Sequence, residues 1–134
     1  MIFRSPHPDF TLPDVSFSDF LLTRCREHAD APAFVDGLSG RVVTFRQLAE
    51  TAERFAAGLA ADGLGPGDVV AVLSPNIPEY AAVLIGVLHA GCRVTTINAL
   101  FTADEVHYQL ADCGARLIVT VPELATDGWG DRAW

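Results

Sequence analysis

Side chains able to do chemistry are sparse in this sequence, and one important kind is missing. The chain has 134 residues, with seventeen acids, nine arginines and no lysine. A phosphate-loop lysine, a Schiff-base nucleophile and an amine general base all require the lysine ε-amino group, so these mechanisms are excluded for the chain itself. The formal charge of −8 also disfavours a nucleic-acid partner, because binding to a phosphate backbone depends on clustered cations.

The thiols and one histidine are candidates for metal binding. Cys25, Cys92 and Cys113 are widely spaced and stand in apolar patterns, which favours buried reduced thiols over a disulfide framework. Cys25 and His28 are three residues apart on a predicted helix, but two ligands without further partners do not make a zinc site. We therefore expect no metal centre.

Neither the serine nor the acids stand in a catalytic pattern. Ser74 lacks a GxSxG environment, so turn or cap chemistry is the expected role of its hydroxyl. Asp104 and Glu105 are adjacent and would point about 100° apart on a helix, so they cannot flank one bond as an acid–base pair. Asp68 precedes a predicted strand, whereas a phosphoacceptor acid would follow one.

The remaining histidines also have simple structural interpretations. His89 lies near the predicted end of a helix, where the helix dipole favours a cation, and His107 falls on the charged side of another helix. With these two accounted for, the sequence assigns no catalytic, cofactor-binding or metal-binding residue.

The elements that must position any site alternate between helix and strand. From Ser16 onward the periodicity predicts a helix to about residue 30, a small hairpin of strands 33–35 and 42–43, and a helix over 45–62. Strands 69–73, 93–97 and 116–121 then alternate with helices over about 78–90 and 103–113. This βαβαβ order predicts an α/β fold: part of a three-layer arrangement around a parallel sheet, with a preceding helix and a short hairpin. Residues 1–15 are proline-rich and are expected to form an extended arm.

Several helix ends carry recognisable caps. Thr44 with Gln47, and Thr102 with Glu105, have the spacing of capping boxes. The other predicted ends are Ser16 as an N-cap, Asn76 and Pro78 at the start of helix 78–90, and Gly63, Gly91 and Gly114 after the three later helices.

A parallel sheet binds ligands where its strands end, which here means residues 74–76 and 98–102. The glycine cluster at 63–68 resembles a phosphate loop only in composition, because it follows a helix and opens a strand instead of the reverse. It is predicted to be a plain turn. A small Rossmann-like nucleotide binder is one alternative function, although the loop over 74–78 has no glycine.

Helix 78–90 is predicted to be apolar almost all round, so it should be buried by more structure than one sheet face provides. Its uncharged run is well short of the ~20 residues that span a bilayer, and the N-terminus has no signal-like apolar region. We expect a cytoplasmic protein without a membrane span.

Six segments, taken in order, are similar to one enzyme family. They are residues 43–48 (VTFRQL), 63–70 (GLGPGDVV), 73–79 (LSPNIPE), 90–98 (AGCRVTTIN), 101–106 (FTADEV) and 115–120 (ARLIVT), and the opening residues 2–5 (IFRS) also match. Each segment alone is weak, but their shared order is a strong signal. Over residues 2 to about 121 the chain resembles the N-terminal part of the adenylate-forming acyl-CoA synthetases, most closely the 4-coumarate:CoA ligase group.

The resemblance implies a ligase that joins an aryl or fatty carboxylic acid to CoA through an acyl-adenylate, using ATP and Mg²⁺. In the family, the phosphate loop and the catalytic lysine lie beyond the matching region. Residues 16–121 would then be a partial AMP-binding domain with 122–134 as a divergent tail. The chain is expected to be an N-terminal fragment that is inactive and needs no cofactor by itself. It should self-associate through an open sheet edge and the uncovered apolar face of helix 78–90. A stand-alone binding or interaction module is the alternative.

Overall fold

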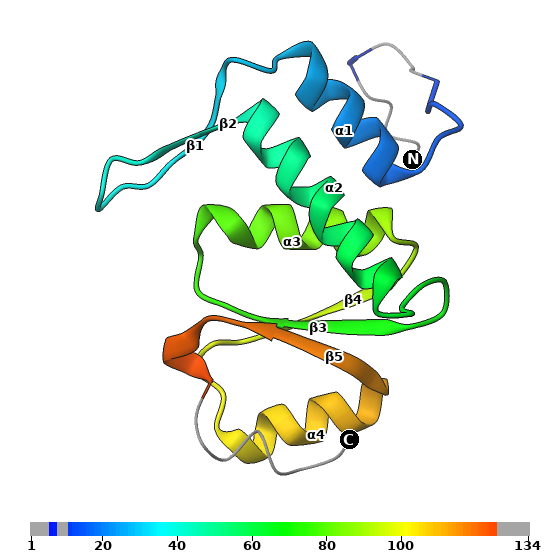
Figure 1. Ribbon diagram of the computed structural model, residues 1–134, viewed down its shortest axis with the longest axis vertical. Helices are drawn as coiled ribbons and strands as arrows, with labels where there is room; N and C mark the ends of the chain where they lie inside the picture. The colour runs from blue at the N-terminus through cyan, green and yellow to red at the C-terminus, as the bar shows by residue number, and fades with distance from the viewer. Residues whose placement is uncertain (1–5, 8–10, 126–134) are drawn as a thin grey trace.

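A parallel three-stranded sheet lies at the centre of the computed structural model, which describes residues 6–7 and 11–125 (Figure 1). Its strand order is β4-β3-β5, so the central strand is the one that comes first in the sequence among the three. The strands are β3 (Val69–Leu73), β4 (Arg93–Ile97) and β5 (Ala115–Thr120). Helices α3 (Pro78–His89) and α4 (Ala103–Cys113) connect them, which confirms the expected α/β architecture.

The remaining elements precede this sheet in the chain. They are α1 (Phe17–Glu27), an antiparallel hairpin of β1 (Pro32–Val35) and β2 (Val42–Thr44), α2 (Phe45–Ala61), and a short 3₁₀ helix, η1 (Pro122–Leu124), that follows β5. Of the expected arm at 1–15, residues 11–15 form neither helix nor strand, and residues 1–5 and 8–10 lie outside the described part. Most of the expected tail, 126–134, also lies outside it.

The helices cover the two faces of the sheet and make three layers (Figure 1). Strand β3 is buried along its whole length, and its side chains alternate between the two faces. Val69, Ala71 and Leu73 join a cluster with Val106 and Leu110 of α4. On the other face Val70 packs with Leu59 of α2 and Val87 of α3. Burial on both faces explains why this strand is an unbroken apolar run.

Side-chain caps fix three of the helix starts as predicted, and at α1 the Ser16 hydroxyl accepts a hydrogen bond from the Asp19 N–H at 3.0 Å. The Thr44 hydroxyl accepts a hydrogen bond from the Gln47 backbone N–H at 3.3 Å, and Gln47 Oε1 accepts one from the Thr44 N–H at 2.9 Å. Thr102 and Glu105 form the same reciprocal pair at the start of α4. The predicted start of α3 was wrong in part. The N-cap is Ile77 instead of Asn76, and its side chain makes no hydrogen bond to the helix end. Pro78 begins that helix with its φ angle already set by the ring.

Helix α3 is covered more completely than expected. It lies between α2 and the sheet (Figure 1), and Ala82, Ile85 and Val87 are buried. Its other apolar side chains are half-buried or better, so the predicted uncovered apolar face is not present. The exposed large apolar side chains lie instead on the 11–20 segment, on the hairpin and around residues 100–101, and Tyr108 on α4 is also exposed.

Gly86 explains how α2 approaches α3 so closely. A Cβ atom at position 86 would lie 2.7 Å from the backbone oxygen of Ala52 and 3.0 Å from Cδ1 of Phe55. Only glycine leaves room for that carbonyl, so this residue sets the distance between the two helices.

The open sheet edges are present as expected. Among the described residues, β4 and β5 each pair with β3 and with no other strand. Within the same part of the chain, no helix combines the length and the apolar character that a membrane crossing requires.

Candidate functional site

The carboxyl ends of the three parallel strands meet at one edge of the sheet. The loops after β3 and β4, residues 74–77 and 98–102, lie at this edge, and the β1–β2 hairpin projects on the same side (Figure 1). Because ligands of open α/β sheets collect at this edge, it is the candidate site of the chain.

Three of the four polar side chains of these loops, all but that of the exposed Asn76, make local hydrogen bonds. The Ser74 hydroxyl donates to the Pro75 carbonyl oxygen at 3.0 Å, and Asn98 Oδ1 accepts from the Leu100 N–H at 3.0 Å. Thr102 is occupied by its capping box with Glu105. Ser74 therefore makes a local turn contact, as the sequence predicted, and no nucleophile–base pair forms among the described loop residues.

The acids at the start of α4 serve the helix end. The Glu105 carboxylate accepts hydrogen bonds from the backbone N–H and the hydroxyl of Thr102, at 2.8 and 2.9 Å. These bonds, the backbone one above all, lower the pKa of Glu105. Asp104 is exposed in the same first turn, where an anion is favoured by the helix dipole. The two acids are not an acid–base pair.

Asp68 lies at the opposite, amino-terminal edge of the sheet, where its side chain contacts the turn before β3 and the start of β5. Its carboxylate accepts from Arg116 Nη1 at 2.8 Å and from the Gly65 N–H at 2.9 Å. The bond from Arg116, followed by the one from Gly65, lowers the pKa of Asp68. Asp68 is thus a structural junction between the turn before β3 and the start of β5.

The glycine cluster forms the turn that the sequence predicted. Gly63 and Gly67 have φ angles of +75° and +98°, a left-handed conformation that strains other residues. The Gly65 carbonyl accepts from Cys92 Sγ at 3.3 Å, and burial raises the pKa of that thiol. The cluster lies at the amino-terminal edge of the sheet, away from the carboxyl ends of the strands, where ligands of open α/β sheets collect.

The remaining candidates are dispersed. His89 Nδ1 lies 3.5 Å from Asp19 Oδ1 and connects the end of α3 with α1, while His107 is half-buried on α4. Cys25 is buried but His28 is exposed, so they do not converge on a metal. Within residues 6–7 and 11–125, no group of three or more histidine, cysteine or acidic side chains is placed to hold a metal ion.

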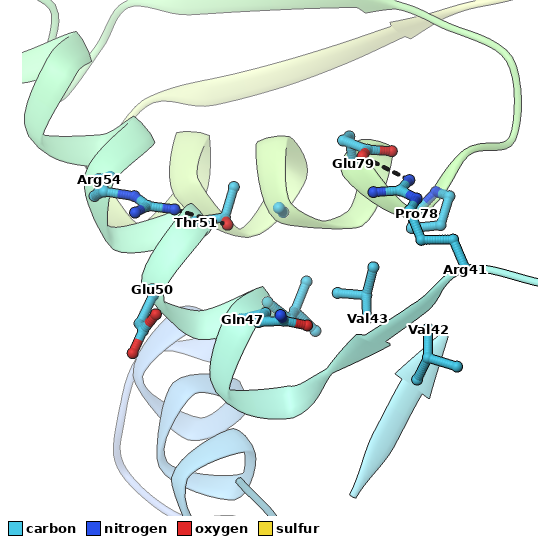
Figure 2. Close-up of a pocket in the computed structure, with 11 residues that line it drawn as sticks. Arg41, Val42, Val43, Gln47, Glu50, Thr51, Arg54, Pro78 and Glu79 are labelled. Carbon is cyan, nitrogen blue, oxygen red and sulfur yellow. Dashed lines mark hydrogen bonds and ion pairs between the residues drawn. The ribbon is translucent and has the colours of Figure 1, made fainter. Parts of the chain in front are cut away.

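Two pockets flank the hairpin at the ligand-binding side of the sheet. The first, of about 390 Å³, is lined in part by the buried Leu48 and Ala82. An ion pair between Arg41 Nη2 and Glu79 Oε1 at 2.7 Å stands at one end (Figure 2). At the other end Arg54 donates to the Thr51 hydroxyl at 3.3 Å. No sequence pattern predicted this pocket, because its walls come from separate elements with no fixed spacing between them.

The second pocket, of about 550 Å³, lies between the hairpin turn and the loop before α3. Its lining is mainly apolar: Phe34, Val35, Leu38, Ile77 and Tyr80 contribute to it. Asp36 holds the adjacent turn by accepting from the backbone N–H groups of Leu38 and Ser39 at 2.9 and 2.8 Å. Both pockets have the size of small-molecule sites, and neither contains an arrangement for covalent chemistry.

Comparison with known proteins places the chain in a family. A model described as "AMP-binding enzyme" matches residues 21–132. The chain is 36% identical over 121 residues to 4-coumarate–CoA ligase 3 of Oryza sativa subsp. japonica, covering 90% of this chain and 22% of that protein. It is 42% identical over 111 residues to a long-chain-fatty-acid–CoA ligase of Escherichia coli O6:H1, covering 82% and 19%.

Solved structures agree with the sequence matches. A Mycobacterium tuberculosis fatty acyl CoA synthetase superposes with a TM-score of 0.76 at 28% identity, over 82% of this chain and 22% of that one. The chain thus spans about a fifth of the length of the relatives it matches. With the family model matching most of its residues, the chain belongs to the AMP-binding, adenylate-forming enzymes that include the acyl-CoA ligases.

Proposed function

We propose that this chain forms the N-terminal part of an ATP-dependent acyl-CoA synthetase and does not catalyse the reaction alone. In that reaction a carboxylate oxygen attacks the α-phosphorus of ATP, which gives an acyl-adenylate and pyrophosphate. The CoA thiol then attacks the acyl carbon, and AMP leaves as the thioester forms. The chain would contribute a folded scaffold to the larger enzyme.

One observation supports the second half of this proposal: most polar side chains in the loops at the carboxyl ends of the strands already make local hydrogen bonds. The Ser74 hydroxyl, the Asn98 amide oxygen and the Thr102–Glu105 pair all satisfy local backbone or one another. A phosphoryl-transfer site needs cations and metal-binding oxygens directed at a triphosphate. The described residues offer no such set, and the chain has no lysine.

ATP, Mg²⁺ and CoA therefore do not fit the donor groups that residues 6–7 and 11–125 present. Glu105 is the acid fixed at the strand-end loops, and it is used by the helix cap. Asp68, which accepts hydrogen bonds from Arg116 and Gly65, lies at the opposite edge of the sheet. We assign no contact with these cofactors to the described residues.

The acyl substrate is left open between two classes. One relative is named for 4-coumarate and another for long-chain fatty acids, with similar identity to this chain. The proposal therefore names a carboxylic acid, aryl or fatty acyl, without choosing between them.

A chimera tests both halves of the proposal. The matched segment of the rice ligase is replaced by this chain, and carboxylate-dependent ATP–pyrophosphate exchange is measured with 4-coumarate and with a long-chain fatty acid. The purified 134-residue chain and the rice ligase without the segment serve as controls. We expect exchange from the chimera and none above background from either control.

Two results would overturn the proposal. Exchange by the 134-residue chain alone would contradict its inactivity. A chimera that folds cooperatively but shows no exchange would contradict the scaffold role, and a stand-alone binding module would then be the better account.

A further inference from the structure

The first pocket, of about 390 Å³, lies between the hairpin, α2 and the start of α3 (Figure 2). Each of these elements contributes apolar side chains to it. Leu48 of α2 and Ala82 of α3 are buried, and Val43 of the hairpin and Pro78 of α3 are half-buried. A surface of this kind can hold the apolar body of a small molecule.

Arg54, at one end of this pocket, is a cation without an acidic partner among the described residues. Its guanidinium donates to the Thr51 hydroxyl at 3.3 Å, and the carboxylate of Glu50 is turned away from it (Figure 2). Five other arginines in the described part of the chain pair with an acid: Arg24, Arg26, Arg41, Arg46 and Arg116. The planar fork of an arginine matches both oxygens of a carboxylate, so Arg54 is available to an anionic ligand.

Two neighbouring side chains of α2 add hydrogen-bond donors to the pocket. Gln47 Oε1 already accepts from the Thr44 N–H at 2.9 Å, which leaves the amide NH₂ group of Gln47 to donate. The Thr51 oxygen accepts from Arg54, and its hydroxyl proton can still be donated. Residues 47, 51 and 54 follow the i, i+4, i+7 spacing of one helix face. They therefore form a row of donors that suits a ligand with acceptor oxygens.

The acids of the pocket limit the charge of such a ligand. Glu79 lies at the other end, where its carboxylate is paired with Arg41 at 2.7 Å, and Glu50 adds a second negative charge to the lining. The two acids balance the formal charges of Arg41 and Arg54. A dianion such as a phosphate would be repelled by both acids, whereas a single carboxylate needs only the contact with Arg54.

We propose that the first pocket is a non-catalytic binding site for a small organic monocarboxylate, with its carboxylate on Arg54 and its apolar body against Val43, Leu48 and Ala82. The pocket lining holds no nucleophile–base pair, so the acid would be bound without being converted. This inference does not depend on the proposed function, because it uses only side chains of this chain. The apolar body can be aryl or alkyl, and the experiment distinguishes the two.

The test is a titration of the ¹⁵N-labelled 134-residue chain with 3-phenylpropanoate and with octanoate, followed by amide chemical shifts. We expect saturable shifts at residues 47–54, with a dissociation constant of about 0.1–1 mM. Residues 35–38 beside the second pocket should not shift. The uncharged 3-phenylpropan-1-ol should bind about fivefold more weakly than the matching acid, and inorganic phosphate should not displace it. The acid that binds more tightly identifies the preferred apolar body.

Two matched variants isolate the contribution of Arg54. R54Q should weaken binding of the acid about fivefold and leave binding of the alcohol unchanged, because one exposed charge-assisted contact is lost. R46Q is the control: Arg46 is also exposed on α2 and its loss changes the net charge equally, but it pairs with Asp30 and does not line the pocket. Its affinity for the acid should equal that of the unaltered chain. Circular dichroism confirms that both variants fold; if R54Q does not, the comparison of acid with alcohol on the unaltered chain decides the question.

Several outcomes would overturn the inference. Shifts that grow linearly without saturation would show that neither acid has a site. Saturable shifts at residues 35–38 instead of 47–54 would place the acid in the second pocket. Equal affinity for the acid and the alcohol, or for R54Q and the unaltered chain, would remove the role of Arg54. Displacement of the acid by phosphate would contradict the argument from Glu50 and Glu79.

Discussion

Replacing Gly86 with alanine should destabilise the protein, although alanine is the better helix former. An added Cβ would stand 2.7 Å from the Ala52 carbonyl oxygen and about as close to Phe55, at 3.0 and 3.1 Å. The first of these contacts is with backbone, so α2 as a whole must shift to relieve it. Overpacking of this kind costs about 1–3 kcal/mol.

The alanine also gains helix propensity, worth about 0.8–1 kcal/mol. The net effect of G86A is therefore a loss of about 1 kcal/mol, and up to about 2 kcal/mol if the helices cannot separate. Gly58 provides the matched control, because it lies in α2 with nothing within 4 Å of its added Cβ. G58A should gain the propensity term alone and be more stable than the unaltered chain by about 0.5–1 kcal/mol.

Urea unfolding followed by far-ultraviolet circular dichroism measures both variants. Since the propensity gain is common to them, the difference between their free energies of unfolding isolates the packing cost, about 1–3 kcal/mol. The reasoning fails if G86A unfolds at the same urea concentration as G58A with an unchanged m-value. In that case the α2–α3 contact would be loose enough to admit a methyl group.

Three further predictions concern acid stability and association. In E105Q the loss of stability between pH 5 and pH 3 should be smaller than in the unaltered chain. The pKa of Glu105 is lowered in the folded state. The stability that Glu105 contributes is therefore present above the ordinary glutamate pKa of about 4.3, and it is lost as the pH falls through the lower, folded-state pKa. D68N should flatten the same acid limb, because Asp68 also has a lowered pKa. Urea midpoints across this range check both variants, and acid limbs parallel to that of the unaltered chain would contradict them. The chain alone should self-associate at micromolar concentration through β5, and V119K should shift it towards monomer in sedimentation equilibrium; a clean monomer that binds no hydrophobic dye would refute this.

Features set by neighbours along the chain were predictable. The Thr44 and Thr102 capping boxes depend on residues three apart, and both are present. The one wrong start, Asn76, has a local cause as well. Pro78 fixes the first helical φ angle and restrains Ile77 to extended backbone, so the helix begins without a side-chain cap.

Features that join distant residues were not predictable from spacing. The cover over α3 depends on Gly86 meeting Ala52, and one end of the first pocket depends on Arg41 meeting Glu79. Neither pair has a period or motif that signals it. For the same reason the role of Ser74 was predictable only in part: the sequence shows no catalytic motif around it, but its bond to the Pro75 carbonyl required coordinates.

The central position of β3 has a consequence for how the protein is made. Because β3 pairs with β4 on one side and β5 on the other, its second side stays open until residues 115–120 have left the ribosome. The interval from Leu73 to Ala115 is about forty residues, which takes on the order of 2–8 s at ~5–20 residues per second. During that time the most apolar strand of the molecule is at most half-paired, because β4 begins only at Arg93. The interval from β3 to β5 is therefore when a nascent chain is most exposed to aggregation and most in need of a chaperone.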